Sequence, residues 1–120
     1  MNEIERHHTS ARMSKIVRHA GLVYLCGQTA SGGAHADGDI GVQTREVLSR
    51  IDALLIEAGS DRGRILSTTI YLRRIDDFAA MNEAWEQWVR PGTAPARTTV
   101  EARLASASLL VEMTVVAAAG

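Results

Sequence analysis

The sequence predicts an α+β domain with a single mixed β-sheet and two helices packed on one face of that sheet. Two stretches carry apolar residues at three- and four-residue spacing, as helices do, and the other apolar stretches alternate with a period of two, as strands do. The resulting order, β-β-β-α-β-α-β-β, lacks the strict alternation of a parallel wound fold. Because 120 residues are enough for one sizeable core, we expect one domain over residues 1–120.

Three short strands are expected before the first helix. Residues 4–8 form a short N-terminal strand. Residues 15–19 and 22–28 are predicted to form a hairpin, because Ala20-Gly21 provides a two-residue break between runs rich in Val, Ile, Leu and Tyr. Residues 29–41 are rich in Ser, Gly, Ala, His and Asp, which predicts a loop. Its glycines lack the strand-to-helix spacing of a phosphate-binding loop.

The first helix is expected over residues 42–58, where Gly59 is placed to end it. Its apolar positions repeat at three and four: Val47, Leu48, Ile51, Leu54, Leu55 and Ala58. Residues 65–72 follow as a strand with two fairly apolar faces, which predicts burial on both sides.

The second helix carries an aromatic stripe, which is more typical of a core face than of a cofactor site. The stripe consists of Phe78, Met81, Trp85 and Trp88. Asp76 or Asp77 is the expected N-cap, and Pro91-Gly92 breaks the chain after the helix.

The next strand begins at Arg97, directly after Pro95-Ala96. Alternation puts two sets of side chains on opposite faces: Arg97, Thr99, Glu101 and Arg103 on a polar face, and Thr98, Val100, Ala102 and Leu104 on a largely apolar one. Arg97 offers a planar charged fork that suits two parallel hydrogen bonds to a carboxylate. The simpler alternative is a solvated edge strand with surface charges.

The last strand is expected over residues 109–118, with Glu112 in the middle of an apolar run. A carboxylate in that setting faces water, pairs with a cation, or is held partly protonated by burial. With both helices on one face of the sheet, the other face has no cover within the chain. We therefore expect self-association through that face, with clefts between subunits along the strand edges.

Composition argues against several classes of function. The formal net charge is −1, which provides no field for nucleic acid or an anionic membrane. Cys26 is the lone cysteine, and the histidines lack zinc spacing, so no metal is expected. A small buried hydrophobe is the simpler interpretation of Cys26, with a reactive thiol as the alternative. No signal-peptide core or apolar run of about 18 residues is present, which favours the cytoplasm.

Several motifs, in order along nearly the whole chain, resemble the RidA/YjgF family, also called the endoribonuclease L-PSP or translation-inhibitor family. They are Leu22-Val23-Tyr24-Leu25-Cys26-Gly27-Gln28, Gln43-Thr44, Asp76-Asp77-Phe78-Ala79-Ala80-Met81-Asn82, Pro95-Ala96-Arg97-Thr98-Thr99-Val100 and Val111-Glu112-Met113. The Ala-Arg-Met-Ser start and the Ala-Trp-Glu-Gln-Trp helix are similar to the YoaB-type branch.

The resemblance implies a chorismate-mutase-like fold, assembled as a homotrimer with a central barrel and three clefts between subunits. It implies deamination of 2-aminoacrylate or 2-iminobutanoate to a 2-keto acid and ammonia without a cofactor. Arg97 would hold the substrate carboxylate, and Glu112 would position water and assist proton transfer. The resemblance suggests four further substrate-binding residues, which are Cys26, Gly27, Thr99 and Arg12.

The chain departs from the deaminase pattern at three positions. Met13 stands where the deaminases usually have a tyrosine, and Arg12 or Ser14 is the nearest polar replacement. Cys26 replaces a serine, and Thr99 replaces a frequent cysteine. These changes keep the carboxylate anchor and alter the rest of the pocket.

Two other functions remain open. A ribonuclease or translation inhibitor would need a basic groove or an aromatic stacking platform, and the near-neutral charge and few aromatic residues disfavour both. A non-catalytic module that binds small carboxylates, or a redox-activated holdase, is the second alternative.

Overall fold

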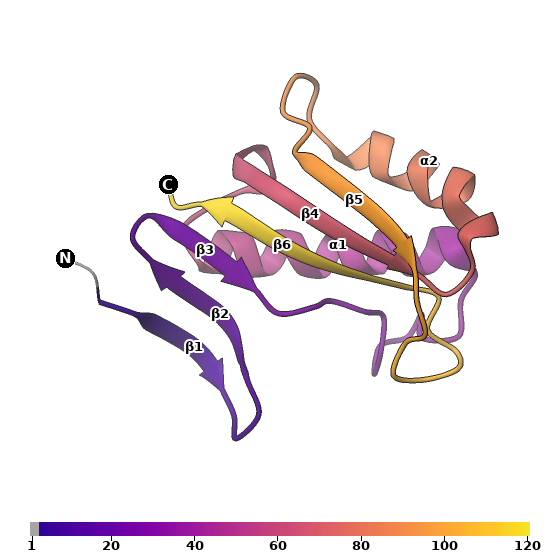
Figure 1. Ribbon diagram of the computed structural model, residues 1–120, viewed down its shortest axis with the longest axis horizontal. Coiled ribbons are helices and arrows are strands. Elements are labelled where there is room, and N and C mark those ends of the chain that lie inside the picture. Colours follow the sequence, from indigo (N-terminus) through magenta and orange to yellow (C-terminus); the bar gives the residue numbers. More distant parts are fainter. Residues whose placement is uncertain (1–2) are drawn as a thin grey trace.

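The computed structural model describes residues 3–120, which form one six-stranded sheet and two α-helices (Figure 1). The elements in chain order are β1 (Glu5–Thr9), β2 (Ser14–His19), β3 (Leu22–Leu25), α1 (Ile40–Glu57), β4 (Ile65–Leu72), α2 (Phe78–Trp88), β5 (Ala96–Glu101) and β6 (Val111–Ala118). Short 3₁₀ turns at Arg62–Arg64 and Ile75–Asp77 precede β4 and α2. The predicted fold class and element order are confirmed.

The sheet is mixed, with the strand order β1-β2-β3-β6-β4-β5. All neighbouring strands are antiparallel except β4 and β5, which are parallel because α2 carries the chain from the end of one back to the start of the other. This crossover puts β5 at one edge of the sheet and β1 at the other (Figure 1).

Both helices cover one face of the sheet, and the core lies between them and the strands. In Figure 1, α1 passes behind the strands, and α2 lies next to β5. Buried side chains of both helices meet those of the strands: Val47, Leu48, Ile51, Leu55, Met81 and Trp85 with Ile70, Leu72, Val111, Met113 and Val115. No helix within the described residues has the length and apolar character to cross a membrane.

Local chemistry explains where the helices begin and end. The Asp39 side chain accepts a 2.9 Å hydrogen bond from the Val42 N–H and starts α1 two residues before the predicted bound. Gly59 adopts a left-handed φ of 81° after α1 ends. Asp77 occupies the N-cap position of α2 but caps nothing, because its ψ of 3° already continues the 3₁₀ turn and its carboxylate does not reach the free N–H groups.

The long loop before β6 is held by buried polar contacts. The Gln43 side-chain nitrogen lies within hydrogen-bond distance of the carbonyls of Ala36, Gly38 and Ser108, and its oxygen accepts from the Leu110 N–H. Gln43 itself is fully buried. Gln43 therefore ties both the loop before α1 and the loop before β6 to the helix.

The face of the sheet away from the helices is open. Rows of side chains cross it from β6 through β4 to β5, one of them Glu112, Tyr71 and Val100. The expectation that both faces of residues 65–72 are buried is wrong for a single chain, since Leu66 is 48% exposed. The predicted open face is present, and nothing within residues 3–120 covers it.

Candidate active site

Arg97 lies in β5 on the side of the sheet that faces α2. Its neighbour across the parallel pair is Thr68, which is 2% exposed and points into the core. The Arg97 Cζ atom lies 5.4 Å from the ring centroid of Trp85 and 5.7 Å from that of Phe78. Arg97 and Thr99, from the polar set, therefore occupy the covered face, and Val100, from the largely apolar set, occupies the open one.

Arg97 is a charged side chain that forms no ion pair with the other described residues. Burial lowers the pKa of Arg97 below its ordinary value, and the charge of Glu86 partly offsets that effect. No acceptor within residues 3–120 takes a hydrogen bond from the guanidinium, which stays charged at neutral pH. Its N–H donors are free for an acceptor from outside the chain, and a carboxylate matches their geometry.

The Arg97 side chain borders a hollow of about 470 Å³ against α2. Trp85, Val89 and Pro91 supply apolar wall, and Asn82 lies on the same side. The Asn82 Oδ1 atom is buried and has no hydrogen-bond partner in the described chain. Sequence reasoning missed Asn82 as a site residue, although its spacing of four from Phe78 and three from Trp85 puts it on the same helical face.

Glu112 lies on the other face of the sheet. Its neighbours in β6, Val111 and Met113, are fully buried against the helices, so the Glu112 side chain points to the open face. It packs over Gly27, where a Cβ atom would lie 3.0 Å from the Glu112 Cδ and closer still to Oε2. The absence of a side chain at Gly27 therefore makes room for this carboxylate.

Cys26 belongs to the Glu112 side of the site. Burial raises the pKa of the Cys26 thiol, and Glu112 adds to that rise, while Lys15 and a hydrogen bond from Gln28 oppose it. The Gln28 Nε2 atom lies 3.2 Å from Cys26 Sγ. The thiol is therefore protonated at neutral pH, which argues against a reactive nucleophile, although Cys26 is only partly buried and not the buried hydrophobe of the simpler interpretation.

The predicted site residues fall into separate groups. Glu112, Gly27 and Cys26 lie together at the open face, whereas Arg97 and Thr99 share the covered face. The Thr99 Oγ1 is buried and has no partner in the described part of the chain. Arg12 lies in the exposed turn between β1 and β2, where its main-chain N–H donates to Ser10 Oγ and its side chain has no hydrogen-bond partner among residues 3–120. Because the sheet separates Arg97 from Glu112, one chain cannot bring both to one small molecule.

Comparison with known proteins identifies the family. The family model described as Endoribonuclease L-PSP matches residues 3–119. A solved member of the YjgF protein family from Neisseria meningitidis is 39% identical and superposes with a TM-score of 0.92, covering 98% of this chain and 96% of that one. The chain belongs to the RidA/YjgF family.

Other relatives agree with this assignment to the RidA/YjgF family. The RutC family protein YoaB from Escherichia coli is 42% identical over 115 residues, which are 96% of this chain and 97% of that protein. An uncharacterized protein from Pseudomonas aeruginosa is 42% identical, with a TM-score of 0.92 over 98% of this chain and 100% of that one. The recognition made from sequence motifs is confirmed.

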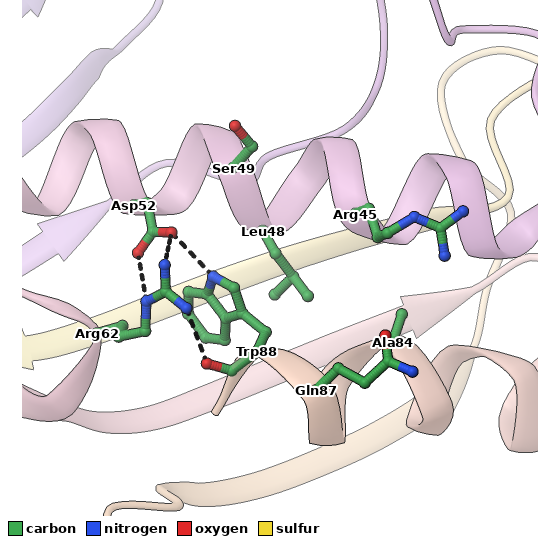
Figure 2. A pocket seen from close by; sticks show the side chains of 8 residues that line it. All are labelled: Arg45, Leu48, Ser49, Asp52, Arg62, Ala84, Gln87 and Trp88. Atoms are coloured by element: carbon green, nitrogen blue, oxygen red, sulfur yellow. Dashed lines mark hydrogen bonds and ion pairs between the residues drawn. The ribbon is translucent and has the colours of Figure 1, made fainter. Parts of the chain in front are cut away.

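A second hollow in this RidA-family chain lies between α1 and α2 and measures about 270 Å³ (Figure 2). At one end, Arg62 donates to both carboxylate oxygens of Asp52 and to the Trp88 carbonyl, and the Trp88 indole N–H donates to Asp52 at 3.0 Å. Figure 2 shows Arg45 extending away from this cluster. Because these polar groups satisfy one another, the cluster serves to fasten the end of α2 to α1.

No group of three or more His, Cys, Asp or Glu side chains within residues 3–120 is arranged to hold a metal ion.

Proposed function

We propose that this protein hydrolyses small 2-imino and enamine carboxylic acids, of the 2-aminoacrylate or 2-iminobutanoate type, to 2-keto acids and ammonia. The observation that carries the proposal is the Arg97 guanidinium, which borders a hollow with its hydrogen-bond donors unused. A carboxylate is the ligand that fits this fork. Membership of the RidA/YjgF family supports the same reaction class.

We further propose that the working site forms between two subunits of a homotrimer. Arg97 and Glu112 lie on opposite faces of their own sheet, so Glu112 has to come from a neighbouring copy. The open sheet face and the edge strand β5 are the surfaces available for such packing.

The chemistry requires positioning and proton transfer. Arg97 binds the substrate carboxylate and fixes the imine carbon. Glu112 accepts a proton from water as the water oxygen bonds to that carbon, and the C=N π electrons move to nitrogen, which takes up a proton. The carbinolamine then collapses: the C–N bond breaks, ammonia leaves with a further proton, and the hydroxyl becomes the carbonyl of the keto acid. An enamine first gains a proton at carbon and loses one from nitrogen, which gives the imine.

Other functions have less support. Trp85, the aromatic residue among those that line the hollow, is only 6% exposed and so offers little surface for stacking a base, and the net charge is −1. A module that binds small carboxylates without turnover would use the same Arg97, so turnover has to be measured directly.

The test is imine hydrolysis by the Arg97→Ala variant. Imines are generated in situ from several amino acids by an amino-acid oxidase, and keto-acid formation is followed with and without the protein. We expect Arg97→Ala to lower kcat/KM by about 100-fold, because a charge-assisted bidentate contact is lost. Arg74→Ala is the matched control, since this exposed arginine near α2 lies outside the hollow.

Three outcomes would contradict the proposal. Hydrolysis at the wild-type rate by Arg97→Ala would show that Arg97 does not bind the substrate carboxylate. Calorimetric binding of a 2-keto acid without any acceleration of hydrolysis would indicate a binding module. RNA cleavage that is independent of Arg97 and steeply weakened by salt would indicate a nuclease.

The subunit arrangement has its own test, in which Arg97→Ala and Glu112→Ala chains are unfolded together and refolded as mixed oligomers. A site built from two subunits regains about a quarter of wild-type activity at equal mixing, since half of each contributing position is intact. A site within one chain regains none. Sedimentation equilibrium of the wild-type protein then gives the oligomeric state, with a monomer contradicting the proposal.

A further inference from the structure

The Arg97 guanidinium is held by two aromatic rings of α2. Phe78 is the first residue of the helix and Trp85 lies two turns later, so the two rings share the face directed at β5. Both centroids lie within 6 Å of Cζ, the range of an effective cation–π contact. Trp85 is 6% exposed and Phe78 is 42% exposed, so one ring is part of the core and the other borders solvent.

This arrangement restrains Arg97 without using its donors. An acidic partner would hold the guanidinium by accepting its N–H groups and would then compete with a substrate carboxylate. Aromatic rings interact with the guanidinium as a cation and leave its edge free. They also limit the rotamers of a long side chain that would otherwise lose about 2 kcal/mol of rotamer freedom on binding.

The Trp85 ring is itself fixed from behind. Its centroid lies 5.7 Å from that of Trp88, and the Trp88 indole N–H is bound to Asp52 (Figure 2). The fully buried Met81 packs in the same core cluster. Trp85 is therefore held by ring contact and core packing, as a positioning element should be, and the hydrogen bond to Asp52 belongs to Trp88 alone.

We propose that Phe78 and Trp85 are positioning residues that orient Arg97 for the substrate carboxylate, an inference that rests on the proposed function. The rings act through the guanidinium and take no part in proton transfer. Because the carboxylate contact is the same in the ground state and the transition state, their removal should raise KM and leave kcat nearly unchanged.

The experiment compares Phe78→Leu, Trp85→Leu and Arg97→Ala in the imine hydrolysis assay, together with calorimetric binding of 2-oxobutanoate. We expect each leucine variant to raise KM and weaken 2-oxobutanoate binding about tenfold, with kcat within about twofold of wild type. Phe78→Tyr and Trp85→Phe keep a ring in place and should restore most of the affinity. If Trp85→Leu is too unstable to purify, Phe78→Leu alone tests the proposal.

Trp88→Phe is the control for loosening of α2. It keeps an aromatic ring beside Trp85, removes the hydrogen bond to Asp52 and leaves both rings next to the Arg97 guanidinium in place, so it should lower the melting temperature and leave KM unchanged. If both leucine variants bind 2-oxobutanoate as tightly as wild type while Arg97→Ala does not, the positioning role is wrong and the proposed function stands. If Trp88→Phe weakens binding as much as they do, helix packing rather than the rings is responsible, and the inference fails. If Arg97→Ala itself has no effect, the proposed function fails first.

Discussion

Replacing Gly27 by alanine should displace the Glu112 carboxylate without altering Glu112 itself. The new Cβ would lie 3.0 Å from Glu112 Cδ and closer still to Oε2. Carbon atoms that are not bonded rest at about 3.5–4.0 Å, so the Glu112 Cδ has to retreat by about 0.5–1 Å and the closer Oε2 by more. Oε2 is the end of a flexible side chain, so rotation of Glu112 relieves the contact at little cost to folding.

Activity should respond more than stability does. A displacement of about 1 Å in a reacting group can lower the rate by about 100-fold, whereas complete removal of a general base costs about 10²–10⁴-fold. The φ of Gly27 lies outside the left-handed region, so alanine fits the backbone. We expect the free energy of unfolding to stay within about 1 kcal/mol of the wild-type value.

The assay is a double-mutant cycle with Gly27→Ala, Glu112→Ala and the double variant, measured as kcat/KM for imine hydrolysis beside urea unfolding. If alanine acts by moving the carboxylate, it should have almost no further effect once Glu112 is shortened. Gly27→Ala with full activity, or an equal loss from it in both backgrounds, would refute the reasoning. In the second case, the methyl group would be blocking the substrate directly.

Three further predictions concern buried contacts and the thiol. Gln43→Leu leaves three carbonyls and one N–H without partners, and should lower the free energy of unfolding by about 2–4 kcal/mol in urea titrations. Asp52→Ala leaves the Arg62 guanidinium and an indole N–H without their acceptor, and should cost about 1–3 kcal/mol in the same measurement, with KM unchanged. Because burial raises the pKa of Cys26, less thiolate forms at a given alkaline pH than in a free cysteine, and the midpoint of iodoacetamide alkylation against pH should lie above the ordinary thiol value. Glu112→Gln should lower that midpoint, since the carboxylate charge contributes to the rise in the pKa of Cys26. An unchanged midpoint would show that Glu112 does not influence the thiol.

Much of the fold was predictable because its elements have local causes. Residues 65–72 form a strand with the predicted bounds, and α1 differs by two residues at its start and one at its end. Other strand bounds differ from the predicted ones where residues far away in the sequence make hydrogen bonds to the chain. Glu101 ends β5 by accepting from the Ile75 N–H, and the Arg73 guanidinium binds carbonyls of the following loop, so the strand stops short of Leu104.

The candidate site was predictable as a set of residues but not as an arrangement. A charged fork after a proline and a carboxylate within an apolar strand are unusual features that single out Arg97 and Glu112. Asn82, Phe78 and Trp85 were not assigned to the site, because an aromatic stripe on a helix is usually core. In this fold the same stripe serves both as core and as the support of Arg97.

The sequence by itself determined the elements, the family and the two charged residues, because periodicity, breakers and motif order are properties of neighbouring positions. Only the tertiary structure decided that Arg97 faces α2 while Glu112 faces the open side. Which of two alternating faces meets the helices depends on the register of β5 beside β4 and of β4 beside β6. Those pairings join residues far apart in the chain, and a shift of one position would have turned each side chain to the other face.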